Sequence, residues 1–343
     1  MSSPDRALGL VSLARGVLAR GHKAQARDLA EQALAAAPDD PHVRVLVAGV
    51  LSHGIPEWHF DLILDQARND AYDAALRRAV RPGMKVLEIG TGSGILAMMA
   101  ARAGAAEVIT CEVNPAIAAV AQANINANGY GDRVRVVAKH STKLDVDADM
   151  DGPADLLVAE IVTNDILGED ALRLKAHARA ELLKPGAALI PAVATARIAL
   201  AHSDQVERVR VGVTDGFDLS ALSRLAPPRW RLAVGSDSLV MRSDPADLFS
   251  FDFRSAPARE PDETATVVLK AEGAGPANCV IQWLELRMDS EIVYENCPRV
   301  GARSCWGILT HPFRRTEFLE AGTPVAVSGT CSANAIQIWT DRH

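Results

Sequence analysis

The sequence predicts a fold of the α/β plus β class: a parallel-sheet domain, an antiparallel β-domain after it, and a short helical region in front. Three observations predict this order. Alanine and leucine recur at helical spacing near the start, strand and helix patterns alternate in the middle, and short alternating runs between turn residues follow. We place the domains at 1–55, 56–190 and 191–343, which suits a chain of 343 residues.

Residues 4–51 are rich in alanine and leucine at helical spacing. Small and apolar residues there match the positions of a tetratricopeptide repeat, in which they let two antiparallel helices approach closely. These positions are Leu13, Ala14, Val17, Gly21, Ala26, Ala30, Ala33 and Pro38. The alternative is a plain helical hairpin, and both interpretations stay open. A single repeat must pack on a neighbour, so we expect a cap more than a groove for partners.

From residue 56 to 190 the pattern alternates between strand and helix, which predicts a doubly wound parallel sheet. Pro185-Gly186 and Pro191 bracket the last strand and mark a boundary. The predicted strands are 85–89, 107–112, 134–138, 156–160 and 187–190, with helices at 95–103 and 116–128 among those between them.

Beyond Pro191 the pattern changes to short alternating runs, such as 265–270 and 279–286. Turn residues separate these runs, so the C-terminal part is predicted to be an antiparallel β-domain. The stretch 206–242 is irregular, and we expect it to form an arm that packs elsewhere.

Composition excludes several classes of protein. The net charge of -7 offers no basic face for phosphate recognition, so we expect no nucleic-acid partner. No apolar stretch is long enough to span a membrane, and the start lacks a basic segment leading into an apolar run. The five cysteines are scattered without a C-x-x-C pair, which favours a reducing compartment and no metal site. We therefore expect a cytoplasmic protein with no membrane association.

A glycine-rich turn follows the first predicted strand of the parallel sheet. It reads Val86-Leu87-Glu88-Ile89-Gly90-Thr91-Gly92-Ser93-Gly94. Such a turn lets backbone N–H groups approach a nucleotide, and an acid about 20 positions on, here Glu112, binds the ribose hydroxyls. Dehydrogenases share the glycines, but Glu88 before them gives the form that S-adenosylmethionine enzymes favour. A tight turn without a ligand is the weaker alternative.

Two glutamates downstream indicate what is done with that cofactor. Glu160 ends the fourth strand, at the carboxyl edge where such sheets bind ligands. Glu169 follows a loop at 164–168 and is predicted to open a helix that runs to Leu183. An acid in a first helical turn is also favoured by the helix dipole alone. Two carboxylates around one pocket are what a planar guanidinium selects, so we predict that Glu160 and Glu169 are catalytic.

From Trp58 to the C-terminus the chain resembles the protein arginine N-methyltransferases, on the glycine turn, the two-glutamate loop and the run Trp58-His59 … Asp65 … Arg68-Asn69 … Tyr72. The resemblance implies a Rossmann-like class I methyltransferase domain and a β-barrel. It also implies that His59 and Arg68 contact the methionine end of the cofactor, with Gly90 at the turn and Glu112 on the ribose. Without the resemblance, Arg68 is interpreted as a surface residue paired with Asp65.

The same resemblance assigns residues of two further loops. Ser141, in the loop 139–142, faces the adenine, although many members of the family have an acid there. The run Ser304-Cys305-Trp306 stands where the family has Thr-His-Trp, so Trp306 is expected to stack on the substrate; a core position is the alternative. The family's histidine pairs with an acid on the helix before the glycine turn, here Asp65. Cys305 is a poor replacement for it, and His311 is the other candidate.

The predicted function is methyl transfer from S-adenosylmethionine to an arginine guanidino group. We favour free L-arginine or a small guanidine metabolite as the substrate, with an arginine-containing peptide as the alternative. A non-catalytic adaptor that binds partners through its helical repeat is a further alternative. The resemblance also implies a homodimer, with the stretch 206–242 as its arm.

Overall fold

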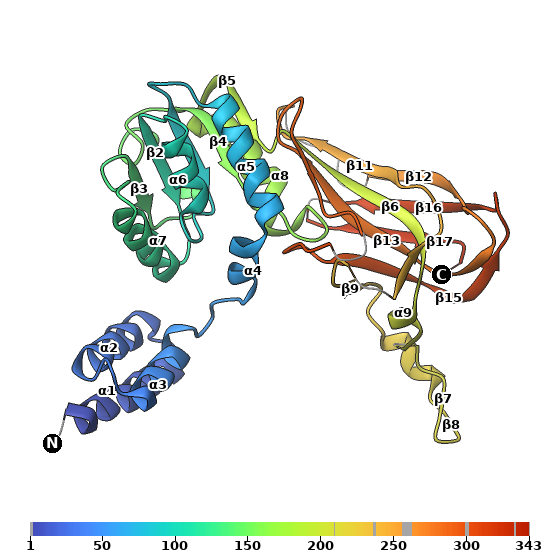
Figure 1. Cartoon of the computed structure of the whole chain (residues 1–343), viewed down its shortest axis with the longest axis horizontal. Coiled ribbons are helices and arrows are strands. Elements are labelled where there is room, and N and C mark those ends of the chain that lie inside the picture. Colours follow the sequence, from blue (N-terminus) through green and yellow to red (C-terminus); the bar gives the residue numbers. More distant parts are fainter. Residues whose placement is uncertain are drawn as a thin grey trace. The chain divides into compact units, whose positions relative to one another are not determined.

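In the computed structural model the chain forms two compact units, Met1–His59 and Phe60–His343. The structure describes residues 3–208, 210–235, 238–255, 263–298, 302–332 and 334–342, and Figure 1 traces their helices and strands. The second unit holds both the parallel sheet and the antiparallel sheets. Within the described ranges, every helix is too short or too polar to cross a membrane.

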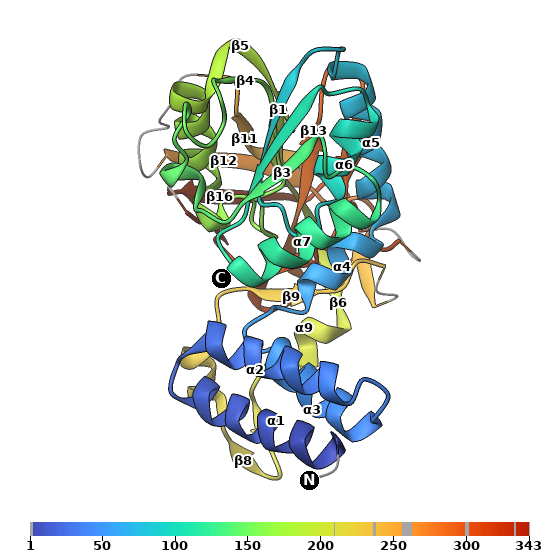
Figure 2. The ribbon, with the colours of Figure 1, turned by 90° about the vertical axis from the view of Figure 1, so that its left-hand side faces the viewer.

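The first unit contains three helices, α1 (Ser3–Ala19), α2 (Lys23–Ala36) and α3 (Pro41–Leu51), which pack side by side in Figure 2. Fully buried alanines, among them Ala14 and Ala30, let the helix axes approach closely. Asp40 begins α3 by accepting hydrogen bonds from the backbone N–H groups of His42 and Val43 at 2.9 and 3.0 Å. The predicted helical region is therefore present. Its assignment as a tetratricopeptide repeat stays a prediction.

A parallel sheet opens the second unit. Its strand order is β3-β2-β1-β4-β5, and every pair is parallel, as the alternating pattern predicted. The strands are β1 (Lys85–Ile89), β2 (Glu107–Cys111), β3 (Val134–Val137), β4 (Ala154–Ala159) and β5 (Leu183–Ile190). The last strand starts earlier than predicted, because Leu183 already pairs with Ala154 before a register shift.

Helices precede and connect the strands of the parallel sheet (Figure 1). They are α4 (Trp58–Leu64), which crosses the division between the units, α5 (Gln66–Ala79), α6 (Ile95–Arg102), α7 (Pro115–Ala127) and α8 (Ala171–His177). A π-helical turn at Ala178–Leu182 continues α8 into β5. The helix predicted to open at Glu169 begins instead at Ala171, because Glu169 and Asp170 both have left-handed backbones, with φ of 58° and 59°.

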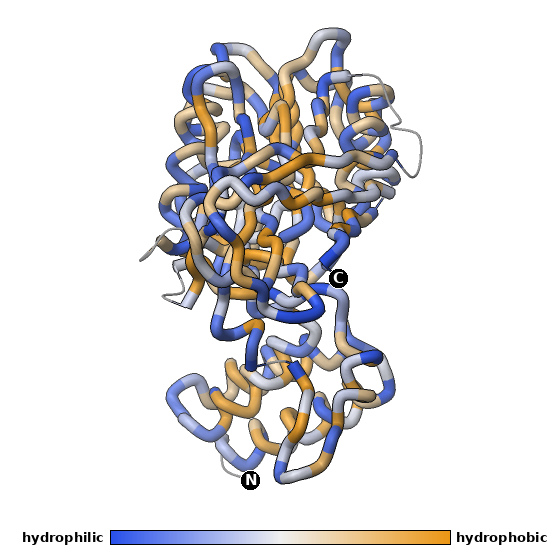
Figure 3. The backbone as a smooth tube through the Cα atoms, turned by 90° about the vertical axis from the view of Figure 1, so that its right-hand side faces the viewer, coloured by the Kyte–Doolittle hydropathy of each residue, from blue (hydrophilic) through white to orange (hydrophobic). Residues whose placement is uncertain are grey.

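The predicted antiparallel β-domain is confirmed, and its strands form two sheets that share one apolar core. The sheet β10-β6-β13-β15-β9 also pairs β11 with β6 and β14 with β13, and the second sheet is β12-β16-β17. The hydrophobic stretches of these strands appear orange in Figure 3. The strands are β6 (Val193–Ser203), β9 (Trp230–Leu232), β10 (Leu239–Met241), β11 (Ala246–Asp252), β12 (Glu263–Lys270), β13 (Gly275–Arg287), β14 (Val293–Glu295), β15 (Ile308–Leu319), β16 (Pro324–Cys331) and β17 (Ile336–Thr340).

The irregular stretch 206–242 is only partly separate from that β-domain, since β9 and β10 belong to its larger sheet. The rest forms an arm, which we define as residues 210–226. It contains the hairpin of β7 (Val213–Thr214) and β8 (Phe217–Asp218) and the short helix Ser220–Leu225, and Figure 1 shows the hairpin projecting from the β-domain.

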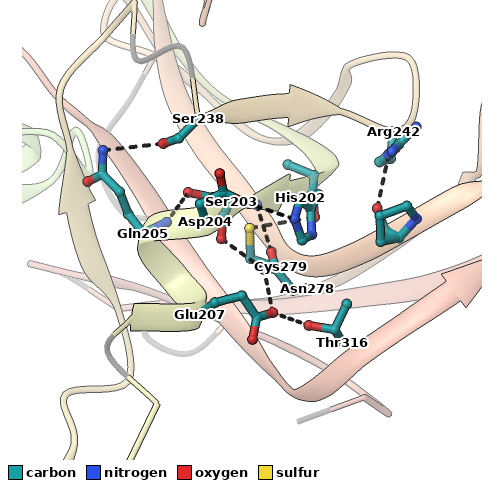
Figure 4. Close-up of polar contacts among 12 residues, drawn as sticks. His202, Ser203, Asp204, Gln205, Glu207, Ser238, Arg242, Asn278, Cys279 and Thr316 are labelled. Atoms are coloured by element: carbon teal, nitrogen blue, oxygen red, sulfur yellow. Dashed lines mark hydrogen bonds and ion pairs between the residues drawn. The ribbon is translucent and has the colours of Figure 1, made fainter.

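A polar network holds the base of the arm, where α9 (Asp204–Arg208) leaves β6 (Figure 4). Glu207 accepts hydrogen bonds from Asn278 Nδ2 at 2.9 Å and from the hydroxyl of Thr316. Asn278 also bonds both backbone groups of Ser203, each at 2.9 Å. The network joins three strands to α9, so the arm begins from a fixed point on the β-domain.

Candidate active site

The start of α5 positions the first group of the site. Asp65 is the N-cap residue, and its Oδ1 accepts a hydrogen bond from the backbone N–H of Arg68 at 2.9 Å. The Arg68 guanidinium donates from Nη2 to Oε2 of Glu160 at 2.8 Å and from Nη1 to Oδ1 of Asn69 at 2.7 Å. The alternative of an exposed Arg68 side chain paired with Asp65 is therefore wrong. Asp65 binds the backbone of Arg68, and the guanidinium binds Glu160.

Glu160 stands directly after β4, at the carboxyl edge of the parallel sheet. The side chains of Arg68 and Glu160 are only 4% and 6% exposed. Burial raises the pKa of Glu160, and the charge of Arg68 opposes that rise. A buried carboxylate is costly unless a cation pairs with it. Because the partner here is itself a guanidinium, Glu160 already makes the kind of contact that an arginine side chain requires.

Glu169 lies in a loop whose backbone is held in an unusual conformation. Thr163 Oγ1 accepts a hydrogen bond from the backbone N–H of Gly168 at 3.1 Å and donates one to Asp165. Ile166 shares the left-handed backbone of Glu169, with φ of 73°. Non-glycine residues adopt this conformation at a cost of about 1–3 kcal/mol each, and such strain concentrates at functional sites. The loop therefore fixes the backbone that carries the exposed Glu169 side chain.

Glu169 interacts electrostatically with carboxylates on two other segments. Desolvation raises the pKa of Glu169, and the negative charge of Glu112 raises it further. The charge of Glu169 contributes in turn to the raised pKa of Glu160. Electrostatic effects of this kind require proximity. The structure thus places Glu169 within electrostatic range of both Glu112 and Glu160, which the sequence places on separate segments.

The glycine turn has the geometry expected of a nucleotide site. Gly90 and Gly92 have φ of 86° and 51°, which side-chain-bearing residues rarely adopt. No described atom lies within 4 Å of the place where a Cβ of Gly92 would stand, so the turn faces open space. Glu112 is buried at the end of β2, where its carboxylate accepts hydrogen bonds from the N–H groups of Gly92 at 3.3 Å and Asn114 at 2.9 Å. The glycine turn and Glu112 therefore have the arrangement predicted for a nucleotide site.

Two buried polar groups of the parallel-sheet part of the chain have spare hydrogen-bonding capacity. The hydroxyl of Ser141, in the loop after β3, has no hydrogen-bond partner among the residues that the structure describes. Burial raises the pKa of Glu88 to about 8, and Thr110 donates a hydrogen bond to its Oε2. Glu88 Oε1 lacks a partner within the same described ranges. Buried polar atoms are rarely left unsatisfied, so these residues fit a bound nucleoside-type cofactor.

Trp306 lies against the glutamate loop. Its indole Nε1–H donates to the backbone oxygen of Val162 at 3.2 Å, and the side chain of Asn164 accepts from the N–H of Gly307 at 2.6 Å. The ring of Tyr294 meets the Trp306 ring edge-on, with centroids 5.5 Å apart. The tryptophan is buried and clamps the β-domain onto the loop that carries the glutamates. Stacking of Trp306 on a substrate stays a prediction.

The acid on the helix before the glycine turn is not paired with His311. The imidazole of that histidine lies within the β-domain, where its Nε2 bonds Gln282 at 3.2 Å. Asp65 Oδ2 instead accepts hydrogen bonds from the hydroxyl of Tyr294 at 2.8 Å and from the backbone N–H of Cys305 at 3.0 Å. Sequence reasoning missed Tyr294. The only available signal was that it is one of three tyrosines in the chain.

A second residue missed by sequence reasoning is Lys175 on α8. It is fully buried, and its Nζ lies 4.4 Å from the centroid of the Phe253 ring. Desolvation lowers the pKa of this amine to about 7, although the charge of Glu160 acts in the opposite direction. Nothing in a helical Lys between apolar neighbours marks it as buried, because lysines are mostly exposed.

His59 belongs to the first unit, where its ring stacks on that of Trp58 with centroids 3.9 Å apart. Its predicted contact with the cofactor stays a prediction. The remaining predicted site residues, Arg68, Gly90, Gly92, Glu112, Ser141, Glu160, Glu169 and Trp306, all lie in the second unit.

Comparisons with known sequences give the family. Over 306 residues the chain is 38% identical to an arginine N(omega)-methyltransferase of Streptomyces achromogenes subsp. streptozoticus, covering 87% of this chain and 84% of that protein. It is 36% identical over 248 residues to protein arginine N-methyltransferase 7 of Drosophila grimshawi, covering 67% of this chain but 35% of that longer protein. Residues 74–192 match the family model described as Ribosomal protein L11 methyltransferase (PrmA).

Solved structures show the same fold. One is the Trypanosoma brucei PRMT1 enzyme-prozyme heterotetrameric complex with AdoHcy, with a TM-score of 0.74 and 22% identity over 85% of this chain and 95% of that chain. Another is Arabidopsis thaliana protein arginine methyltransferase 10, with a TM-score of 0.68 and 19% identity over 82% of this chain and 95% of that chain. The chain therefore belongs to the S-adenosylmethionine-dependent arginine N-methyltransferase family and is an enzyme of that class.

Proposed function

We propose that this protein transfers a methyl group to a guanidino nitrogen of free L-arginine or of a small guanidine metabolite. The observation that supports this most directly is the buried contact between Glu160 and a guanidinium, that of Arg68, at 2.8 Å. Glu169 and its strained loop lie on the same edge of the sheet. Together they offer the two carboxylates that a planar guanidinium selects.

Glu160 and Glu169 orient the substrate and hold its positive charge. Guanidinium is a poor nucleophile, because it stays protonated and its lone pairs are delocalised. Carboxylates beside it concentrate electron density on one nitrogen and receive the proton that this nitrogen loses. When bound, S-adenosylmethionine supplies a methyl group on a positively charged sulfur. Glu160 and Glu169 would hold the guanidino group in place and balance its charge, so positioning and electrostatics would supply the acceleration.

The cofactor is held by residues of the first half of the parallel sheet. Gly90 and Gly92 allow the backbone to approach it, Glu112 takes the ribose hydroxyls, and the Ser141 hydroxyl supplies a hydrogen bond. Arg68 contacts the methionine end while it neutralises Glu160. A cofactor contact of His59 stays a prediction of the family resemblance.

The choice of free arginine rests on the similarity to the Streptomyces arginine N(omega)-methyltransferase, which matches most of both chains. The similarity to protein arginine N-methyltransferase 7 supports the alternative, a peptidyl arginine, over a smaller share of that protein. A non-catalytic adaptor built on the helical repeat is a further alternative, and the intact carboxylates argue against it.

We also propose a cytoplasmic homodimer. The arm of each chain carries large solvent-exposed apolar side chains. Among them are Val213, Phe217 and Leu225, which are 73%, 70% and 81% exposed. Exposed apolar patches of this kind commonly mark protein interfaces. The scattered cysteines favour the reducing cytoplasm.

Mass spectrometry of reactions with S-adenosylmethionine tests the substrate. We expect free L-arginine to gain a methyl group, while an arginine-rich peptide of equal concentration gains little. Gain on the peptide alone would replace the proposal with the peptidyl alternative. Gain on neither, together with no heat of S-adenosylmethionine binding in calorimetry, would support the adaptor.

A further inference from the structure

Tyr294 is held by two neighbouring segments of the β-domain, β13 and the loop at 304–306. It lies in β14, where it pairs with Leu286 of β13. Its ring is buried and packs edge-on against Trp306. The neighbouring Asn296 accepts from the N–H of Leu284 at 2.9 Å and donates to the backbone oxygen of Trp306 at 3.2 Å. The phenol therefore has one position, between the loop at 304–306 and the start of α5.

The hydroxyl of Tyr294 belongs to a directed chain of hydrogen bonds. The N–H of Trp306 donates to Ser304 Oγ at 3.1 Å, and the Ser304 and Tyr294 hydroxyls lie 2.6 Å apart. Tyr294 donates onward to Asp65 Oδ2 at 2.8 Å. Because the Tyr294 proton is donated to Asp65, the Ser304 hydroxyl must be the donor in its hydrogen bond to Tyr294. Burial raises the pKa of Tyr294 above its usual range, so the phenol keeps the proton that it donates.

Asp65 transmits this contact to the catalytic groups. Its two carboxylate oxygens have different partners. Oδ2 accepts hydrogen bonds from the Tyr294 hydroxyl and the N–H of Cys305, whereas Oδ1 caps α5 by accepting one from the N–H of Arg68. Arg68 in turn binds Glu160. One carboxylate thus joins the β-domain to the first turn of the helix that carries the partner of Glu160.

We propose that Tyr294 is a positioning residue for methyl transfer: by holding Asp65, it fixes the start of α5 and so the Arg68–Glu160 pair. This inference rests on the proposed function. Of the two sequence-based candidates for the contact with Asp65, His311 lies elsewhere, and Cys305 shares Asp65 with the hydroxyl of Tyr294 on β14. Tyr294 acts through Asp65, since its hydroxyl is already used by Asp65 and Ser304.

Tyr294→Phe removes only the hydroxyl and keeps the packing against Trp306. Hydrogen bonds to charged groups are strong, so we expect kcat for methylation of arginine to fall about 10-fold to 100-fold. The unfolding midpoint changes little, because the buried ring stays. Tyr130→Phe is the matched control, since that tyrosine lies after α7 beside Arg133, and it is expected to keep wild-type kinetics.

The pH profile separates positioning from a merely structural effect. Loosening Arg68 weakens the cation that opposes the raised pKa of Glu160, so the acid limb of kcat/KM moves to higher pH in Tyr294→Phe. The other groups that act on this ion pair are unchanged by the substitution. They are Tyr72 on α5, Glu169 before α8, Lys175 on α8 and Cys305 in the β-domain.

A double-mutant cycle with Asp65→Asn completes the test. If Tyr294 acts through Asp65, adding Tyr294→Phe to Asp65→Asn changes kcat by less than about 3-fold. Fully additive losses, or an unshifted acid limb with unchanged kcat in Tyr294→Phe, would overturn the inference. Methylation of arginine by the wild-type protein is measured in the same series, so failure of the proposed function appears separately as a wild-type protein without activity.

Discussion

Two buried ionisable groups, Glu160 and Lys175, have pKa values shifted by burial. Glu160 follows β4 and Lys175 lies on α8, and each acts on the pKa of the other. Glu160 has a cation in contact, whereas the Lys175 amine has no hydrogen-bond partner within the described part of the chain. The pair of Glu160 and Arg68 serves function, whereas burial of the Lys175 amine lowers the stability of the fold.

Methylation should be lost at a higher pH than an ordinary glutamate would give. Burial raises the pKa of Glu160, and desolvation raises that of Glu169, both from 4.5. The carboxylates must be ionised to hold a guanidinium, so kcat/KM falls as the pH drops through these raised values. A pH–rate profile checks this. An acid limb at or below 4.5 would contradict the role of the buried carboxylate.

Lys175→Met should stabilise the protein. The pKa of Lys175 falls from 10.5 to about 7 on folding, so between these values the unfolded chain binds more protons and stability rises with pH. The free-energy cost of burying the Lys175 amine is therefore greatest at pH 7 and below. An apolar side chain of similar size removes it, and we expect a gain of about 1–3 kcal/mol in unfolding free energy near pH 7.

Chemical denaturation at pH 7 and at about pH 10 measures this gain, which should shrink at the higher pH. Lys184→Met is the matched control, because Lys184 is half exposed and pairs with Asp155 at the surface; its effect should be small. Destabilisation by Lys175→Met would show that the amine has a partner that stabilises its charge.

Sequence patterns identified the residues that local motifs mark. The glycine turn, Glu112 and Glu160 follow strands, and parallel strands deliver their carboxyl ends to one edge. Tyr294 could not be found this way, because 229 residues separate it from Asp65. Its contact depends on how β14 packs against the start of α5, which no periodicity encodes.

The glutamate loop is where sequence reasoning about a whole element failed. An acid before a helical run predicted that Glu169 opens the helix, but α8 starts two positions later. Cross-loop bonds from Thr163 and the left-handed backbone of Glu169 and Asp170 prevail over local helix preference. The loop therefore behaves as a folded element in its own right.

Gly168→Ala tests the importance of that loop. A Cβ at Gly168 would stand 2.4 Å from the side chain of Thr163, so either the loop or Thr163 must move. We expect the rate of arginine methylation to fall at least about 10-fold, because small displacements of catalytic groups are costly. Gly9→Ala on α1 is the control, since no described atom lies within 4 Å of its Cβ position. Equal activity in both variants would show that the loop tolerates rearrangement.

For the molecule as a whole, the order of domains was predictable and the details of the C-terminal part were not. Periodicity distinguishes helices from strands, so the alternation of the parallel sheet was apparent. The stretch 206–242 lacked such a signal, because β9 and β10 are three residues each and take their stability from neighbouring strands. The base of the arm was equally unpredictable, because Glu207 is held by Asn278 of β13 and Thr316 of β15, which are distant in sequence.

The arm carries the prediction about assembly. Replacing Phe217 and Leu225 together by Asp places two charges on its exposed apolar face, which should convert a dimer into a monomer in analytical ultracentrifugation. Phe318→Asp is the control, since Phe318 is 67% exposed on β15 outside the arm. A wild-type monomer, or a dimer that survives the arm substitutions, would contradict the proposed arm interface.

The most direct measurement is tandem mass spectrometry of free L-arginine after reaction with S-adenosylmethionine that carries an isotope-labelled methyl group. We predict that the label appears on a guanidino nitrogen, and that Glu160→Gln reduces its rate of appearance at least about 100-fold. Label on the α-amino group, or an unchanged rate in Glu160→Gln, would contradict a guanidinium site built on Glu160 and Glu169.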